Sequence, residues 1–406
     1  MTARLSDQPW LSASATRAVM AALEAAGGPG CARFVGGCVR NALIGRPVAD
    51  IDIATKLQPD EVDRAIRSAG LKSVPTGIAH GTVTAVAERT PFEITTLRRD
   101  VSTDGRNATV AFTDDWAEDA ARRDFRLNAL YADADGLVFD PTGAGVADAL
   151  AGRIVFVGDP ETRIREDFLR ILRFFRFQAW YGRGEPDPAA LEACRSLAPG
   201  MTRLSAERVS TELMKLLSAP DPRTAVRAMA GTGVLAQVLP EGELTPLFDA
   251  AVEQGGDAIA RLMMLLPPDE AVIRSATARL RFPNAARDRL VFAALALSAV
   301  RLSMSDRAAR AALYRHGRRA VSDAIRRRWA QAPDQGDGAR RLLALADGWT
   351  RPRLPVSGRD VARLGIEPGP ETGRILQAFE EAWIAEDFPA AGHAERLADL
   401  VSALRG

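Results

Sequence analysis

The chain reads FVGGCVRNALIGRPVADIDIAT over residues 34–55, and this stretch decides the fold that we expect for the first part of the molecule. The apolar run before Gly36 indicates a strand, the pair Gly36-Gly37 a turn, and the following residues the start of a helix. Such a junction can present backbone N–H groups to a phosphate, and Arg40 adds a cation one helical turn further on. The segment ADIDIA then indicates a second strand.

Two carboxylates, Asp50 and Asp52, lie one residue apart in this second strand. Because side chains alternate between the faces of a strand, both acids point to one face, and Ile51 and Ile53 point to the other. Neighbouring carboxylates repel each other unless a cation lies between them. Mg²⁺, which binds through one or two carboxylates together with substrate phosphates, is the cation that we expect. Two charges on a solvent-facing edge strand remain the alternative explanation.

A third acid, Glu93, lies in the later predicted strand FEITTLR, residues 92–98. Two-metal phosphoryl transfer commonly uses a third carboxylate to hold the second ion. We therefore predict Asp50, Asp52 and Glu93 as catalytic residues, with Asp50 and Asp52 as metal ligands. An exposed glutamate on a strand would give the same pattern.

The composition excludes several classes of protein. The formal net charge is only +1 for 406 residues, so the molecule as a whole is not basic. Three cysteines, an odd number, argue against a disulfide framework and predict a cytoplasmic protein. The N-terminal sequence lacks the apolar core of a signal peptide. The longest apolar run, residues 291–300, is about half of a membrane span, so we expect no membrane partner.

The pattern of strands and helices divides the chain into parts. Residues 30–156 mix short β-rich runs with turns and a predicted helix at 59–70, and another predicted helix at about 16–26 precedes them. From about Thr162 onward, helical sequence alternates with short Pro- and Gly-containing loops. We predict an α+β fold, in which an N-terminal mixed-sheet domain is followed by an all-α C-terminal half. The boundaries that we expect are 1–158, 159–220, 221–333 and 334–406.

Arginine is concentrated in residues 301–328, which contain nine Arg, no Lys and two Asp. Guanidinium groups suit phosphates and stack on bases. A solvated helix face in a chain poor in lysine would have the same composition, so the sequence leaves both interpretations open.

Four motifs occur in a fixed order: GGCVRNALIG with DIDIAT, RRDFRLNALYA, REDFLRILRFFRF and LSAERVSTELMKLL. Together they resemble the class II CCA-adding tRNA nucleotidyltransferases and bacterial poly(A) polymerases over about residues 30–217. The resemblance implies a polymerase-beta-like head domain with nucleotide-binding Gly36, Gly37 and Arg40. It also implies a Mg²⁺-dependent enzyme that adds CCA to the 3′ end of tRNA from CTP and ATP without a template. DNA is not an expected partner, and the helical half is expected to bind tRNA.

The second motif is associated in the family with ribose recognition, which the resemblance assigns to Arg123 and Asp124, with Asn128 as support. A carboxylate beside a guanidinium can grip a ribose hydroxyl. Two positions depart from the family pattern, Arg126 where Thr is usual and Asn41 where Asp is common.

The third motif, residues 165–177, is expected to form one helix that carries Asp167 and Arg170 on the same face. The resemblance implies that this pair reads the incoming base. Cytosine and adenine both present an amino donor beside a ring-nitrogen acceptor, whereas uracil and guanine present the opposite order, which would leave a polar group unpaired at about 1–3 kcal/mol. An ordinary intrahelical ion pair is the alternative. Arg173 and Arg176 complete the expected nucleotide-binding residues.

Other segments receive supporting roles. The fourth motif, with Ser205 as its N-cap, is expected to brace the base-reading helix. The polar segment VSTDGRNA, residues 101–108, is expected to be a mobile loop beside the site, and in the family such a loop is associated with the switch from C to A addition. Residues 140–160 are expected to form a hinge.

Alternative functions remain open at this point. A poly(A) polymerase and an enzyme that adds only CC or only A share these motifs, although the neutral C-terminal sequence ADLVSALRG favours CCA addition. A catalytically silent RNA-binding relative is a further alternative, which the intact Asp50 and Asp52 argue against.

Overall fold

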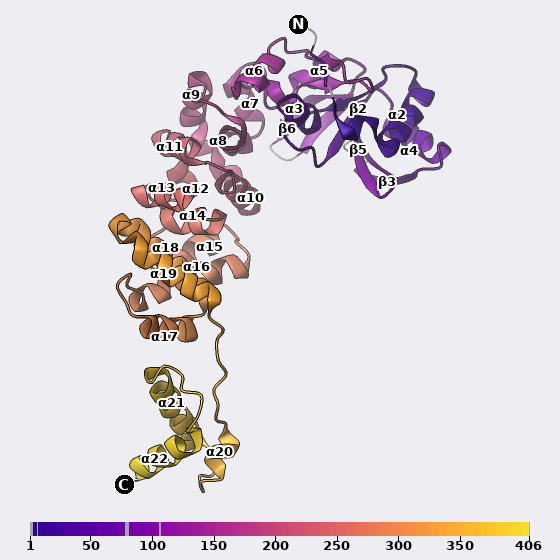
Figure 1. Ribbon diagram of the computed structural model, residues 1–406. Coiled ribbons are helices and arrows are strands. Elements are labelled where there is room, and N and C mark those ends of the chain that lie inside the picture. The colour runs from indigo at the N-terminus through magenta and orange to yellow at the C-terminus, as the bar shows by residue number, and fades with distance from the viewer. Residues whose placement is uncertain (1–2, 6, 78–80, 105–106, 406) are drawn as a thin grey trace. The chain divides into compact units, whose positions relative to one another are not determined.

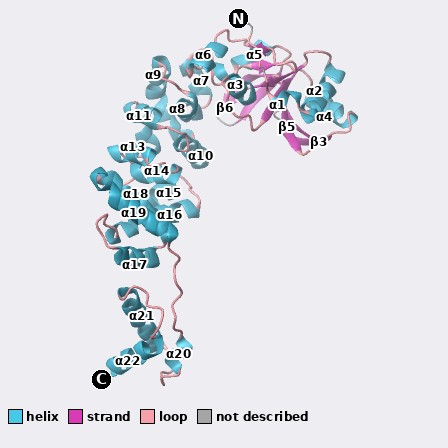
Figure 2. Cartoon of the chain, viewed as in Figure 1, coloured by secondary structure: helices cyan, strands magenta, loops and turns pink. Residues whose placement is uncertain are grey.

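The computed structural model describes residues 3–5, 7–77, 81–104 and 107–405. The chain divides into two compact units, Met1–Pro240 and Glu241–Gly406. Among the described residues, strands occur only in the first unit, and none follows Phe139 (Figures 1 and 2). The predicted α+β class with an all-α second half is therefore confirmed. The predicted domain boundaries near residues 158, 220 and 333 stay predictions.

A seven-stranded sheet forms the centre of the first unit, in the order β3-β4-β5-β2-β1-β8-β9. Its neighbouring strands are antiparallel, except that β2 and β5 are parallel. This parallel pairing sets Asp52 opposite Glu93. The strands are β1 (Ala32–Val35), β2 (Ile51–Thr55), β3 (Lys72–Gly77), β4 (Thr82–Ala87), β5 (Thr90–Thr96), β8 (Tyr131–Ala132) and β9 (Val138–Phe139).

Helices near the N-terminus cover the sheet with their apolar sides. These are α1 (Pro9–Ser12), α2 (Ser14–Gly27), α3 (Gly37–Leu43) and α4 (Pro59–Ser68). In α2, Val19 and Leu23 are fully buried. In α4, Pro59 occupies the first turn and Gln58 and Glu61 form a capping box, so the start that the sequence predicts at residue 59 is confirmed.

The rest of the first unit is helical and is joined to the sheet by aromatic rings. Phe125, at the end of the sheet region, packs against Phe156, Phe174 and Phe177 with ring centroids 4.8, 6.4 and 5.0 Å away. Buried ring pairs of this kind fix how a helix lies on its neighbour. The elements are α5 (Trp116–Ala121), η2 (Arg126–Asn128), α6 (Gly145–Ala151), α7 (Pro160–Glu166), α8 (Leu169–Tyr181), α9 (Pro188–Leu197), η3 (Ala198–Arg203), α10 (Ala206–Leu217), α11 (Arg223–Gly231) and α12 (Val234–Val238).

The second unit consists of helices around several apolar clusters. One cluster includes Val321 and Leu342, another includes Phe379 and Trp383, and a smaller one includes Met264. The helices are α13 (Pro246–Glu253), α14 (Ala258–Leu265), α15 (Glu270–Arg279), α16 (Asn284–Ala296), α17 (Asp306–His316), α18 (Arg318–Gln331), α19 (Gly336–Gly348), α20 (Gly358–Ala362), α21 (Pro370–Ala385) and α22 (His393–Arg405), with short 3₁₀ turns at η4 (Leu297–Ala299) and η5 (Pro333–Gln335).

The expectation of one continuous helix over residues 165–177 is wrong. Helix α7 ends at Glu166, Asp167 has an extended backbone, and α8 begins at Leu169. The carboxylate of Asp167 accepts the backbone N–H of Leu169, 3.1 Å away. A short acidic side chain that bonds the backbone two residues later competes with the helical hydrogen bond, which explains the break.

The segment expected to be a mobile loop, residues 101–108, forms two paired strands over its described residues. Strands β6 (Arg98–Asp104) and β7 (Asn107–Phe112) pair antiparallel as a two-stranded sheet, and residues 105–106 between them lie outside the described residues. Strand β3 was likewise not expected.

A substitution at Gly145 tests how closely α6 packs. A Cβ at this position would lie 2.5 Å from the backbone oxygen of Arg126, which cannot swing away as a side chain can. We expect Gly145→Ala to lower the free energy of unfolding by about 1–3 kcal/mol, measured by urea unfolding. Gly231→Ala, where a Cβ meets nothing within 4 Å, is the control and should not destabilise. Equal stability of the two variants would contradict the close packing.

Candidate active site

The glycine turn lies against the second motif. Gly36 has φ 72° and ψ −117°, a combination that is open essentially to glycine alone. A Cβ at Gly36 would lie 3.6 Å from a terminal nitrogen of Arg123. The turn after β1 therefore needs Gly36 for its backbone conformation, and it brings the start of α3 next to Arg123.

Three carboxylates lie together on two neighbouring interior strands of the sheet. Asp52 in β2 is directly opposite Glu93 in β5, and Asp50 immediately precedes β2. Burial together with the charges of Glu93 and Asp50 raises the pKa of Asp52 to about 6, and the charge of Arg123 acts against them. The structure brings the three predicted acids together, although their catalytic role stays a prediction.

The donor set suits a divalent cation of the Mg²⁺ type. Among the described residues, no group of three or more His, Cys, Asp or Glu side chains is arranged to hold a metal. Asp50 and Asp52 remain the predicted ligands, and two carboxylates are what Mg²⁺ takes when substrate phosphates and water complete its shell. The charges of Glu93 and Asp50 both act on Asp52, and carboxylates that lie so close together suit a hard cation.

Asp119 is the residue that orders the second motif, and the sequence analysis missed it. It is 1% exposed and accepts hydrogen bonds from Arg122, Arg123 and the hydroxyl of Tyr131. Burial opposes its ionisation, but the charges of Arg123 and Arg122 outweigh burial and lower its pKa to about 2. The signal was present in the sequence, since Asp119 lies three and four residues before these arginines on one helical face.

Asp124 is held from two sides. Arg173 of α8 donates to one carboxylate oxygen through Nε at 2.8 Å, and the Nδ2 of Asn128 donates to the other at 2.9 Å. Burial opposes ionisation of Asp124, and Arg173 together with Asn128 lowers its pKa to about 2. The predicted ribose-binding carboxylate is thus tied directly to the helix that follows the base-reading segment.

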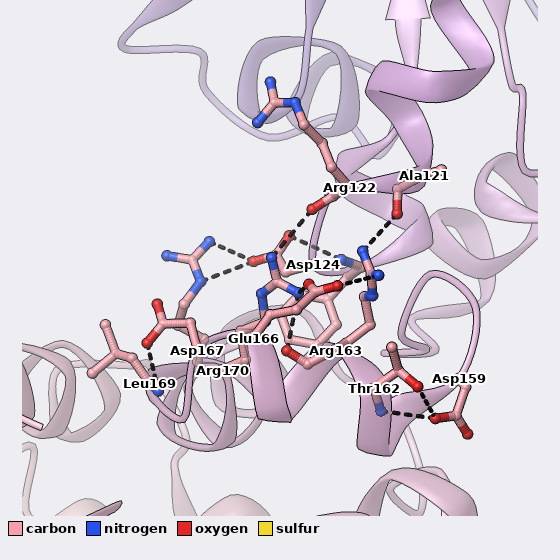
Figure 3. Close-up of polar contacts among 12 residues, drawn as sticks. Ala121, Arg122, Asp124, Asp159, Thr162, Arg163, Glu166, Asp167, Leu169 and Arg170 are labelled. Carbon is pink, nitrogen blue, oxygen red and sulfur yellow. Dashed lines mark hydrogen bonds and ion pairs between the residues drawn. The ribbon is translucent and has the colours of Figure 1, made fainter. Parts of the chain in front are cut away.

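The side chains of Asp167 and Arg170 lie in one segment and have different partners (Figure 3). Asp167 accepts from Arg208 of α10 at 2.6 Å. Arg170 pairs with Glu166 and donates to the backbone oxygens of Arg163 and Arg122, 3.0 and 3.2 Å away. The alternative of an intrahelical pair between Asp167 and Arg170 is therefore wrong. The contact with Arg122 sets the base-reading segment against the second motif.

Helix α10 braces α8 in the way that the sequence predicts. Besides the Arg208–Asp167 pair, Glu212 accepts from Arg176 at 2.6 Å. Arg176, predicted as nucleotide-binding, therefore forms part of this brace. Ser205 is the N-cap residue of α10, but its side chain makes no capping hydrogen bond.

Both departures from the family pattern have local partners. Asn41 accepts from Arg40 at 2.8 Å and donates to the backbone oxygen of Pro47 at 3.0 Å. Arg126 lies 3.7 Å from the carboxylate of Asp148 on α6. Arg126 thus has its own carboxylate partner outside the predicted site.

Many of the arginines in residues 301–328 form ion pairs or hydrogen bonds within the second unit. Ion pairs join Arg310 to Asp387, Arg315 to Glu381 and Arg319 to Asp257. Arg327 donates to the backbone oxygens of Met263 and Leu266, and Arg328 donates to that of Leu297. These contacts favour a structural role for much of the stretch.

The chain resembles known proteins over most of its length. Residues 32–155 match the family model described as Poly A polymerase head domain, and residues 185–244 match the one described as probable RNA and SrmB-binding site of polymerase A. The mitochondrial CCA tRNA nucleotidyltransferase 1 of Mus musculus is 34% identical over 86% of this chain and 82% of its own length. The CCA-adding enzyme of Levilactobacillus brevis is 32% identical over 92% and 94% of the two chains.

A solved structure agrees with these sequence relatives. The CCA-adding enzyme of Bacillus stearothermophilus, in complex with CTP, aligns with a TM-score of 0.75 and 26% identity over 97% of this chain and 98% of its own. In the described part of the chain, no helix has the length and apolar character needed to cross a membrane.

Replacing Asp119 tests the buried ion pairs. We expect Asp119→Asn to lower the free energy of unfolding at pH 7 by about 3–5 kcal/mol, because Arg122 and Arg123 lose their shared carboxylate. The folded-state pKa of about 2 lies below the ordinary 3.8, so the contribution of Asp119 is present above pH 3.8 and is lost as the pH falls toward 2. Urea unfolding as a function of pH should show a shallower acid decline for the variant.

The control for this prediction is Asp60→Asn, an exposed acid of α4. It should leave both the stability at pH 7 and the acid decline unchanged. An Asp119→Asn protein as stable as the control would contradict the role that we give to this carboxylate.

Proposed function

Because the chain belongs to the family of CCA-adding tRNA nucleotidyltransferases, we propose that it adds CCA to the 3′ end of tRNA, transferring CMP and AMP from CTP and ATP without a nucleic-acid template. The observation that carries this proposal is the register of β2 and β5, which sets Asp52 beside Glu93 next to the glycine turn. Carboxylates of this kind suit metal-assisted transfer of a nucleotidyl group.

In the proposed mechanism, Asp50 and Asp52 hold Mg²⁺ and Glu93 supports the same site. The bound ion would supply neutralisation of the triphosphate and activation of the attacking 3′-hydroxyl. The backbone at Gly36 and Gly37 would receive the phosphates. The acids of the chain therefore act as ligands and hold the reacting groups in place.

The sugar and the base would be read by groups from two elements. Arg123 and Asp124, with Asn128 and Arg173 around them, would bind the ribose. Asp167 and Arg170 would pair with the base, the carboxylate accepting from the amino group and the guanidinium donating to the ring nitrogen. To reach a base, Arg170 has to exchange part of its bonding to Glu166 and the nearby backbone.

The remaining parts of the proposal concern the RNA and the domains. We retain the predicted boundaries at 158, 220 and 333, with the helical parts after residue 220 as the tRNA-binding region. Placement in the cytoplasm also remains a prediction. Poly(A) addition is the second candidate function, because the matching head-domain model is named for poly(A) polymerase.

The first test is nucleotide incorporation with Mg²⁺, each NTP singly and together, and tRNAs that end before C, CC or CCA. On the tRNA that ends in CC, we expect the addition of a single A and no further extension. Asp52→Ala should lower incorporation at least about a hundredfold, the loss that even an outer-shell change can cause at a metal site. Asp60→Asn is the matched control.

Other outcomes separate the alternatives. Unlimited A addition would replace the proposal with polyadenylation. Extension by CC alone or by A alone would reduce it to a partial activity. Full activity of Asp52→Ala would overturn the role of this carboxylate.

The second test concerns base selection by Arg170. Arg170→Lys keeps the charge but loses the planar fork, so kcat/KM for CTP and ATP should fall about tenfold to a hundredfold relative to UTP and GTP. Single-nucleotide incorporation with each of the four NTPs measures this ratio. Arg165→Lys, at an exposed position of α7 paired with Glu161, is the control. Unchanged selection in Arg170→Lys would show that Arg170 does not read the base.

A further inference from the structure

One side of α8 faces the nucleotide-binding part of the first unit. Arg173, Phe177 and Tyr181 follow each other at intervals of four residues, which gives a stripe along one helix face. Arg173 binds Asp124 near the start of the helix. The ring of Phe177 packs 5.4 Å from that of Tyr181, the last residue of α8.

Tyr181 makes two kinds of contact with arginines from the region after the glycine turn. The Nη2 of Arg40 donates to the phenolic oxygen at 2.8 Å, and the guanidinium carbon lies 4.0 Å from the centre of the ring. Arg46 approaches the same ring at 4.8 Å. A hydrogen bond and two cation–π contacts therefore attach the end of α8 to this region.

Arg40 links Tyr181 to the carboxylate of Asp124, the predicted ribose-binding group. It is 6% exposed, and burial lowers its pKa, so its N–H groups depend on protein acceptors. Its Nη1 donates to the Oδ1 of Asn128. The amide of Asn128 is thereby oriented with Nδ2 toward Asp124, to which it donates at 2.9 Å. Helix α8 thus contacts both oxygens of Asp124, Oδ2 directly through Arg173 and Oδ1 through Tyr181, Arg40 and Asn128, and Oδ1 also accepts the backbone N–H of Phe125 at 2.8 Å.

We propose that Tyr181 is a positioning residue for ribose selection, acting through Arg40 and Asn128 on the carboxylate of Asp124. The inference rests on the proposed function, in which Asp124 binds the ribose. The guanidinium of Arg40 is held by two neighbouring acceptors, the hydroxyl of Tyr181 and the Oδ1 of Asn41, and its orientation decides which way the amide of Asn128 faces. Loss of the hydroxyl leaves Asn41 as the one remaining of these two acceptors, which weakens the hold on Arg40 and, through Asn128, on Asp124.

The test compares Tyr181→Phe with Trp180→Phe in the full-length protein. Tyr181→Phe keeps the ring and its stacking on Arg40 and Arg46 but loses the hydroxyl. Trp180→Phe is the control, because it also removes one hydrogen bond from the last turn of α8, the Nε1 bond to the backbone oxygen of Lys215 at 2.7 Å, and has no link to Arg40. The readout is the ratio of kcat/KM for CTP to that for dCTP, with KM and kcat determined separately.

Tyr181→Phe is expected to lower the preference for CTP over dCTP about threefold to tenfold, which is less than the full value of one hydrogen bond to a charged group because Tyr181 acts through Arg40 and Asn128. KM for CTP and for ATP should rise by the same factor, because the two nucleotides share the sugar, while kcat stays within about twofold. Trp180→Phe should keep the wild-type preference. A preference in Tyr181→Phe equal to that of the control overturns the inference, and so does a change that affects only CTP or only ATP.

Equilibrium dialysis with CTP and dCTP separates this inference from the proposed function. A wild-type protein that binds CTP more tightly than dCTP but does not extend tRNA overturns the proposed function. The ratio of the two affinities in Tyr181→Phe then decides the inference, since it should fall by the same factor. A wild-type protein that binds both nucleotides equally overturns the inference.

Discussion

The register of two parallel strands places Asp52 beside Glu93, and the rest of the first unit is arranged around this pair. The packing of the sheet does not require acids here, because Ile51 and Ile53 satisfy the buried face of β2. Burial and the charges of Glu93 and Asp50 instead oppose the ionisation of Asp52, and its pKa rises to about 6. A cluster of acids that lowers stability and lies near a glycine turn is typical of a site that binds a cation and a phosphate. The nearest compensating charge, Arg123, is itself anchored by Asp119.

Helix α8 connects this cluster to base and sugar selection through bonds at both of its ends. Arg170 reaches the backbone of Arg122 at one end, and Tyr181 meets Arg40 at the other. Between them, the rings around Phe125 exclude water, so the polar groups at the contact depend on protein partners. A shift of α8 along its axis would break several of these bonds at once. Helix α8 therefore has one well-defined position in the first unit, and this position also fixes the side chains that it carries.

The sequence predicted what depends on neighbours along the chain and missed what depends on distant partners. The strand that the segment ADIDIA predicts is present as β2, although Asp50 lies just before it, and Pro59 with Glu61 was sufficient to predict the start of α4. The break at Asp167 depends partly on Arg208, which is 41 residues away. Pairing of β6 with β7 is a matter of backbone register, which a polar composition conceals.

The contacts of Asp119 and of Tyr181 also depend on distant partners, so the sequence alone did not predict them. Asp119 belongs to an acidic stretch, residues 114–119, yet its side chain is buried, and two arginines and a tyrosine hydroxyl donate hydrogen bonds to it. Asn41 and Arg126 depart from the family pattern, and each is matched by its surroundings: Asn41 still offers Arg40 an acceptor, and Arg126 meets the buried carboxylate of Asp148. A motif position is therefore better judged by the partner that its side chain meets than by the residue type alone. By that standard, Arg40 is the position on which the glycine turn, the ribose-binding carboxylate and the end of α8 all converge.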